Sequence, residues 1–249
     1  MFGSRTSSQR SRERIAKYTY RWKSSKEAFV AWDSDKKEEI ELPSKAILIP
    51  LTSTMMITGS RARGKGSSTH YTNVYSNEFT NFDSDIVTVI ENDSFDGTKT
   101  EIVKGVYSPT VKEAISDLPY ANFTKVLYCL YDGDVVRLTL RASSLRPWIE
   151  FENKMKEKHI NLYKGHAIKV VGVNDGSFGA VQFKTPEFGA TEISSKEDAI
   201  ATETAIEVEN AILRNLQASG VAEAPTEVPT TAPEPTTASE EISLEEIPF

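Results

Sequence analysis

Alternation of apolar and polar side chains is the first pattern in this chain, and it predicts strands. Between residues 17 and 23 aromatic side chains occupy alternate positions, which places Tyr18, Tyr20 and Trp22 on one face of a strand. Segments rich in β-branched, aromatic and alternating apolar residues predict further strands at 27–32, 37–42, 45–59 and 70–80. The first third of the chain is therefore expected to form a β-sheet.

Asp-Gly dipeptides separate three further pairs of apolar segments. Such a dipeptide between two strand patterns is typical of a β-hairpin, because glycine accepts the positive φ angle of a tight turn. The predicted hairpins join 85–92 to 100–107 at Asp96-Gly97, 123–131 to 135–141 at Asp132-Gly133, and 166–173 to 178–185 at Asp175-Gly176.

Three segments have the start signals or the period of helices. Ser108 followed by Pro109 predicts a short helix, and Ser143 or Ser144 precedes a helix that begins at Leu145 and ends near residue 159. The segment 195–218 has a serine cap, acidic residues in its first turn and a glycine beyond its end. Its apolar stripe comprises Ala201, Ala205, Val208, Ile212 and Leu216. This stripe is expected to dock on the strands, and a homodimer through it stays open.

Many short strands with a few embedded helices predict a mainly β fold with added helices, specifically a small β-barrel elaborated by insertions. The single cysteine, Cys129, excludes an internal disulfide, and the three histidines lack the spacing of metal ligands. No apolar stretch approaches the roughly 20 residues of a membrane-spanning helix. We therefore expect a soluble protein without a metal or cofactor.

Charge divides the chain into two parts. From Pro186 onward there are 14 acidic and 2 basic residues, a net charge of −12, which leaves +5 for the first 185 residues because the whole chain carries −7. A mildly basic body with an acidic tail is typical of a polyanion-binding protein that carries its own competitor. An ordinary domain with an acidic solubilising end would have the same distribution.

The first predicted strand combines aromatic and cationic residues. Bases could stack on Tyr20 and Trp22 while Lys17, Arg21 and Lys23 neutralise phosphates, and this is one interpretation of the pattern. Aromatic rows also pack into β-sheet cores. The sequence favours neither interpretation over the other.

A glycine-rich segment at 59–68 supplies Arg61, Arg63 and Lys65, and we place it beside a nucleic acid together with His70, Tyr71 and Tyr75. The segment also matches the phosphate-binding pattern GxxxxGK[ST] until Gly66 replaces the metal-binding hydroxyl. A P-loop must be followed by a helix, whereas the residues after this segment are β-branched and aromatic. Nucleotide hydrolysis is therefore a weak alternative.

The end of the chain has a composition of its own. Residues 222–239 consist largely of Pro, Thr, Ala and Glu, which predicts a semi-extended tether. The last residues combine acidic charge, apolar side chains and, we expect, a free carboxylate, in the order Glu245, Glu246, Ile247, Pro248 and Phe249. Capture of such a terminus is a known mode of protein recognition, so this tip is predicted to recruit another protein.

The tip resembles the acidic Ile-Pro-Phe terminus of bacterial single-stranded DNA-binding proteins. The body resembles bacteriophage single-stranded DNA-binding proteins of the OB-fold type, through motifs that occur in the order Tyr75-Ser76-Asn77-Glu78, Gly105-Val106-Tyr107, Pro147-Trp148-Ile149-Glu150-Phe151 and Pro186-Glu187-Phe188. The resemblance implies an OB-type barrel that binds single-stranded DNA. It also implies that the tip recruits replication, recombination or repair proteins and that the tail competes with DNA for the binding groove.

These patterns predict a flexible basic arm (1–16), an OB-type nucleic-acid-binding domain (17–193), a helix (194–219), a disordered linker (220–239) and the acidic tip (240–249). We expect a non-enzymatic protein that acts in bacteriophage DNA replication and recombination, in the cytoplasm of the infected bacterium. Three alternatives remain: an RNA-binding or cold-shock-like module, a P-loop-like nucleotide-binding enzyme, and a virion structural protein.

Overall fold

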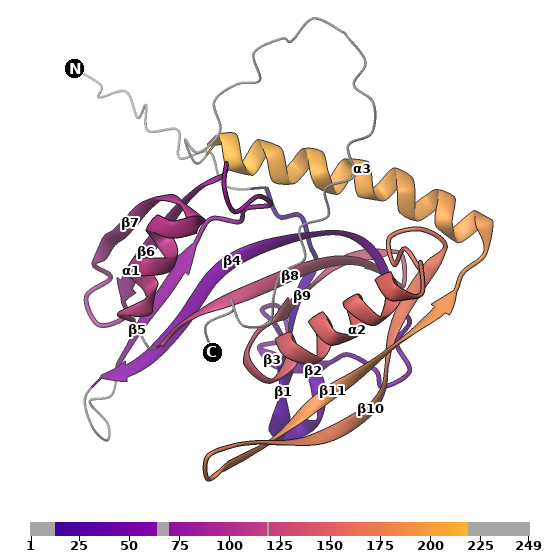
Figure 1. The fold of residues 1–249 in the computed structure, drawn as a ribbon, viewed down its shortest axis with the longest axis horizontal. Coiled ribbons are helices and arrows are strands. Elements are labelled where there is room, and N and C mark those ends of the chain that lie inside the picture. Colours follow the sequence, from indigo (N-terminus) through magenta and orange to yellow (C-terminus); the bar gives the residue numbers. More distant parts are fainter. Residues whose placement is uncertain (1–12, 64–69, 119, 219–249) are drawn as a thin grey trace, which may run out of the picture.

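Strands dominate the computed structural model, which describes residues 13–63, 70–118 and 120–218 (Figure 1). Nine strands form one mixed sheet in the order β3-β2-β1-β9-β8-β4-β5-β6-β7. Their bounds are β1 Tyr18–Lys23, β2 Ala28–Asp33, β3 Glu38–Glu41, β4 Ile49–Arg63, β5 His70–Ser76, β6 Ile86–Asp93, β7 Lys99–Val106, β8 Ala121–Tyr131 and β9 Asp134–Leu140. Neighbours are antiparallel except β1 and β9, which are parallel.

The expected mainly β architecture with added helices is confirmed. In the part of the chain that the structure describes, the sheet order ends at β3 and β7, so a closed barrel is not formed. The remaining strands are β10 His166–Phe178 and β11 Val181–Glu192, and the helices are α1 Lys112–Ser116, α2 Leu145–Glu157 and α3 Ser195–Ala218. Short 3₁₀ turns occur at Ser24–Lys26 and Ala142–Ser144, and an irregular helical turn at Tyr107–Val111. Among these described helices, none is long and apolar enough to cross a membrane.

Alternation along β8 divides the sheet into two faces. Phe123, Leu127 and Cys129 belong to the large core under α2 and the β10-β11 hairpin, whereas Val126 and Tyr128 belong to a smaller cluster under α3. Successive side chains of a strand point to opposite faces, so these helices lie on opposite sides of the sheet (Figure 1). We call the two sides the α2 face and the α3 face.

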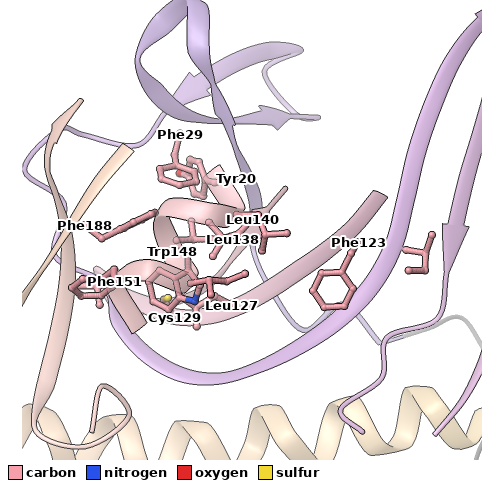
Figure 2. Close-up of a cluster of buried hydrophobic side chains, with 14 of the residues drawn as sticks. Tyr20, Phe29, Phe123, Leu127, Cys129, Leu138, Leu140, Trp148, Phe151 and Phe188 are labelled. Carbon is pink, nitrogen blue, oxygen red and sulfur yellow. The ribbon is translucent and has the colours of Figure 1, made fainter. Parts of the chain in front are cut away.

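Trp148 of α2 occupies the centre of the large core and is fully buried (Figure 2). Its ring centroid lies 5.2 Å from that of Phe188 in β11 and 5.6 Å from that of Phe151. Phe29 of β2 extends this aromatic group across the sheet, with its ring 6.3 Å from Phe188. Each such side chain contributes about 1.5–3 kcal/mol by leaving water, so this cluster fixes α2 and the hairpin on the sheet.

α3 begins as its sequence predicts. The amide and hydroxyl of Ser194 donate hydrogen bonds to the Glu197 carboxylate at 2.8 and 2.6 Å, and the Glu197 amide lies 3.3 Å from the Ser194 hydroxyl, which together form a capping box. Within the predicted stripe, Ala201, Val208 and Ile212 are buried against the sheet. The expected docking of this helix on its own strands is confirmed.

Residues before β1 fasten the other end of α3. The Glu13 amide donates to the Asn215 side-chain oxygen at 2.9 Å, and the Glu13 carboxylate lies 3.0 Å from the Arg214 guanidinium. The region 13–17 therefore joins the start of β1 to the last turns of the helix.

The predicted hairpins are present, but one turn was wrong. Asp132 and Gly133 both have positive φ angles (50° and 79°), as a tight turn between β8 and β9 requires. Asp175 and Gly176, the third predicted turn, instead lie within β10, where Asp175 pairs with Lys184 and forms a 2.9 Å ion pair with it. The chain reverses at Gly179, which has a φ of 57°.

The predicted glycine-rich loop is also shorter than expected. β4 continues to Arg63 and pairs with β5 from His70 onward, so Gly59–Arg63 is strand rather than loop. Gly59 fits there because a β-carbon would lie 2.0 Å from the Tyr120 carbonyl oxygen. Gly59 permits a close approach of two backbones rather than the flexibility that the composition of the segment suggested.

Candidate nucleic-acid interface

Strand register brings two arginines together on the α3 face. Arg21 of β1 pairs with Thr139 of β9, which pairs in turn with Val126 of β8, a residue that packs under α3. Arg141 follows Thr139 by two positions and therefore lies on the same face as Arg21. Both arginines lie near the C-terminal end of β9. Val135, near the N-terminal end of the same strand, packs against the smaller cluster under α3.

Among the described residues, no carboxylate neutralises either arginine. Arg21 is exposed and Arg141 is half-buried, and within the described ranges neither forms an ion pair. Burial, and then the nearby charge of Arg21, lower the pKa of Arg141. Two positive charges held together without a counter-charge favour binding of an anion such as phosphate, to which guanidinium groups donate paired hydrogen bonds.

The backbone at Arg141 is held by a hydroxyl. The Arg141 amide donates to the Ser144 Oγ at 3.1 Å, and the same hydroxyl donates to the Arg141 carbonyl at 3.0 Å. Ser144 is buried where the chain passes from β9 into α2. Arg141 therefore projects from a corner that the core fixes, so little ordering is needed when it binds a ligand.

A third arginine on this face is paired. The Arg137 guanidinium lies 2.6 Å from the Glu78 carboxylate, which also accepts hydrogen bonds from the hydroxyls of Thr54 and Tyr128. Burial, and then the Glu78 charge, raise the pKa of Tyr128, so its hydroxyl remains a donor. The Nε of Arg137 is buried without a hydrogen-bond partner in the structure.

A pocket of about 480 Å³ opens above this pair, between β1, β2 and the last turns of α3. Trp32, Arg137, Glu78 and Leu216 are among the residues that line it. Trp32 is 63% exposed, although most large apolar side chains of this chain are buried. An exposed indole beside a basic sheet face is suited to stacking on a base.

Two tyrosines continue the same side of the sheet. Val74 is part of the large core, so alternation places its neighbours Tyr71 and Tyr75 of β5 on the α3 side; Tyr71 is 52% exposed and Tyr75 is half-buried. Five strand spacings separate β2 from β5, roughly 24 Å. We call Arg21, Arg141, Trp32, Tyr71 and Tyr75 together the arginine surface.

The structure separates the site residues predicted on the first strand. Tyr20 is 4% exposed and burial raises its pKa to about 12, so its ring belongs to the core and is removed from the set of stacking candidates. Trp22 is half-buried, and its Nε1 donates to the Lys184 carbonyl at 2.8 Å. Lys17 and Lys23 are paired with Asp134 at 2.6 Å and Glu39 at 3.0 Å. Of this group Arg21 alone joins the arginine surface.

The residues predicted on the glycine-rich segment are only partly described. Alternation from Ile57 places Arg61 on the α2 side, where its guanidinium stacks on Tyr120 at 4.5 Å and lies 3.8 Å from Glu91. The side chains of Arg63 and His70 lie outside the described residues, as does all of Lys65. The segment leads into strand β5 rather than into the helix that a P-loop requires.

Three residues of the site were not among the sequence predictions. Arg137 and Arg141 alternate with Val136, Leu138 and Leu140, so a two-residue period along 135–141 did signal a basic face. Trp32 gave no such signal, because it ends a continuous apolar stretch. The predicted partner-binding tip, Glu245, Glu246, Ile247, Pro248 and Phe249, lies outside the described residues.

No protein-family model matches this chain, and searches of the curated proteins and of the solved structures yielded no significant match.

Proposed function

We propose that this chain is a non-enzymatic, sequence-tolerant single-stranded DNA-binding protein that acts in bacteriophage replication and recombination, in the cytoplasm of the infected bacterium. The observation that carries the proposal is the pair Arg21 and Arg141, which no described carboxylate neutralises and which lies on a sheet face that also presents exposed aromatic rings. Phosphates bound at the arginines release counterions, while bases stack at about 1–3 kcal/mol each.

The proposal favours single strands over duplexes. In a duplex the faces of the bases are stacked on one another, whereas a single strand can turn its bases onto Trp32, Tyr71 and Tyr75. The spread of the surface over roughly 24 Å would suit several nucleotides rather than one. Sequence tolerance follows, because every base has an aromatic face.

We propose that the sheet is an OB-type barrel elaborated by insertions, an architecture that is partly open and so is compatible with a sheet that ends at β3 and β7. In its support, β4 pairs with both β5 and β8 and has a register shift between Pro50 and Thr52, a feature that lets a strand bend. The motif resemblance to bacteriophage single-stranded DNA-binding proteins supports the same assignment.

The acidic tip recruits replication or recombination proteins in this proposal, and it competes with DNA for the arginine surface when no strand is bound. The charge difference between the tail (−12 from residue 186 onward) and the body (+5) supports competition, because a tethered polyanion is attracted to the same cations as DNA. Bound DNA would then release the tip for its partners.

The direct test is fluorescence anisotropy of labelled oligo-dT, its duplex and a matched RNA, titrated with salt. We expect tight binding of the single strand that weakens with salt, and tighter binding by a chain that ends at Ser239. Equal affinity for RNA would move the assignment to the RNA-binding alternative, and no preference for single strands would remove the proposal. Unchanged affinity after truncation at low salt would remove the competition alone.

Substitutions locate the surface. Arg21→Ala and Arg141→Ala should each weaken oligo-dT binding and lower the slope of log K against log salt by about 0.7, the value for one lost phosphate contact on a single strand. Lys17→Ala is the matched control, because that cation is already paired with Asp134. Equal losses from all three variants would show general charge attraction rather than a built site.

A further inference from the structure

A groove of about 530 Å³ on the α2 face lies between α2 and β11. Its apolar lining comes from Phe151, Met155, Ile160, Phe188 and Pro186, and polar groups line it to a similar extent. Lys154 of α2 and Lys158, the residue that follows the helix, are among these; both are exposed and, in the described part of the chain, neither forms an ion pair. A groove with apolar walls and cations on one rim favours a ligand that has apolar and anionic groups together.

Two carboxylates also line the groove. Glu150 is paired with Arg146 at 2.9 Å, whereas Glu187 is exposed beside Gly172 of β10 and, among the described residues, forms no ion pair. Lys154 in α2 and Lys158 at its C-cap are four residues apart, and both line the groove. Two cations at this spacing can contact two carboxylates of one short peptide.

We propose that this groove binds the C-terminal tip of a second copy of the chain. The tip offers Ile247, Pro248 and Phe249 to the apolar lining, and Glu245 and Glu246 to the two lysines. The inference rests on the proposed function, since DNA bound on the arginine surface is what releases the tip. The groove lies on the opposite face of the sheet, so a copy bound to DNA keeps it accessible.

The path of the tail favours a second copy over the same copy. The tail begins after α3, a helix of 24 residues that is about 36 Å long, whereas Glu187–Ala190 of the groove lies close to the first turn of that helix. A semi-extended, proline-rich chain of the length of 219–239 would cover about 65 Å at about 3.1 Å per residue. Docking in the same copy would use most of that length, because the tail would have to run back along α3 and around the sheet to its other face, whereas a neighbour on the same DNA strand imposes no such path.

The consequence is self-association that depends on DNA. Copies bound side by side on one strand would be linked by tip and groove, so binding to long strands would be cooperative. Binding to one strand raises the local concentration of the tip beside the groove of the next copy. Free copies at low concentration would not make this weak contact.

The first experiment measures anisotropy of a labelled peptide with the sequence of residues 240–249 against the full chain carrying Phe249→Ala. We expect the peptide to bind, and Lys154→Glu and Lys158→Glu should each weaken its binding about tenfold. Lys156→Glu is the control, because Lys156 is on α2 but does not line the groove, and it should change the affinity less than twofold. A peptide with Phe249→Ala should bind at least tenfold more weakly, and this arm cannot unfold the protein. No peptide binding, or equal losses in all three lysine variants, would overturn the proposal.

The second experiment separates this inference from DNA binding. Lys158→Glu should bind short oligo-dT as the unsubstituted chain does but lose cooperativity on long poly-dT. Retained cooperativity would overturn the link between copies while leaving the DNA-binding proposal intact. If the Phe249→Ala chain bound the peptide but the unsubstituted, DNA-free chain did not at any dilution, the tip would dock within its own copy. That outcome would also overturn the proposal.

Discussion

The two faces of β9 differ in what covers them. Val136, Leu138 and Leu140 point into the large core, where α2 and the β10-β11 hairpin cover them completely. Arg137, Thr139 and Arg141 point to the α3 face, where among the described elements α3 covers the Val135 end. The same seven residues thus anchor the fold on one side and offer hydrogen-bond donors on the other, so changes on the two faces should have separable effects.

A second contrast lies within the α3 face. Arg137 in β9 and Arg141 just beyond its end are four residues apart, yet Glu78 pairs with the first and no described carboxylate pairs with the second. A buried pair stabilises its surroundings only when both partners remain, whereas an unpaired cation is available to a ligand. The first arginine is therefore a structural residue at the edge of a pocket, whereas the second is a binding residue in our proposal.

The largest expected effect compares the tryptophans of the two faces. Trp148→Ala should lower the free energy of unfolding by about 3–5 kcal/mol, because it leaves a cavity in a core that cannot collapse around it. Trp32→Ala should lower it by less than about 0.5 kcal/mol, because that ring is already exposed. Urea denaturation followed by circular dichroism measures both. Equal losses would show that the α3 face is as much part of the core as the α2 face.

The two tryptophans should rank in the opposite order when the loss of DNA affinity is measured instead of the loss of stability. Trp32→Ala is expected to weaken oligo-dT binding by about 1–3 kcal/mol if one base stacks on the ring. A conservative Trp148→Phe, which keeps the core largely filled, should leave the affinity unchanged in anisotropy titrations. If Trp148→Phe weakened oligo-dT binding and Trp32→Ala did not, the interface would lie on the α2 face and not on the α3 face.

The pair Glu78 and Arg137 sharpens the contrast between the two arginines. Glu78→Gln keeps the shape of the side chain but leaves Arg137 facing a neutral amide, so unfolding free energy should fall by about 1–3 kcal/mol. The same change removes a negative charge from the basic face, so oligo-dT binding at low salt should become tighter by a few-fold. Chemical denaturation and anisotropy on one preparation give both quantities.

An exposed pair serves as the control. Arg146 and Glu150 form an i,i+4 pair on α2 whose side chains are 61% and 52% exposed. Glu150→Gln should change stability by less than about 0.5 kcal/mol and leave DNA binding unchanged. If it matched Glu78→Gln in either measurement, the position of Glu78 beneath the pocket would have no special importance.

Local patterns predicted most elements of this fold because local energetics decide them. The turn at Asp132-Gly133 follows from positive φ angles, and α3 from its cap and stripe. Asp175-Gly176 has the same dipeptide but stays in strand, because Lys184 and Phe183 across the hairpin continue the ladder. A dipeptide that is typical of turns stays in the strand when both strands of the hairpin can continue to pair beyond it.

The candidate site was harder to predict because it depends on partners distant in sequence. Tyr20 and Arg21 are neighbours, and only the parallel pairing of β1 with β9 sends one into the core and the other beside Arg141. Lys17 and Lys23 look as basic as Arg21 until Asp134 and Glu39 are placed beside them. Alternation shows which residues share a face, but burial and charge pairing decide which of them can bind.

The smallest expected effect concerns how α3 is held on its face. Ser194→Ala removes the hydroxyl that donates to Glu197, which should cost about 1 kcal/mol and lower the melting temperature by roughly 2–4 °C. The hydrogen bonds from the Ser194 hydroxyl and amide lower the pKa of Glu197, so their contribution is complete above the ordinary glutamate pKa and is lost as pH falls through the lowered one. The difference between variant and unsubstituted chain should therefore be largest at neutral pH and shrink below about pH 4. Ser177→Ala, at an exposed position in β10, is the control, and a difference that grew in acid would contradict the capping role of the Glu197 carboxylate.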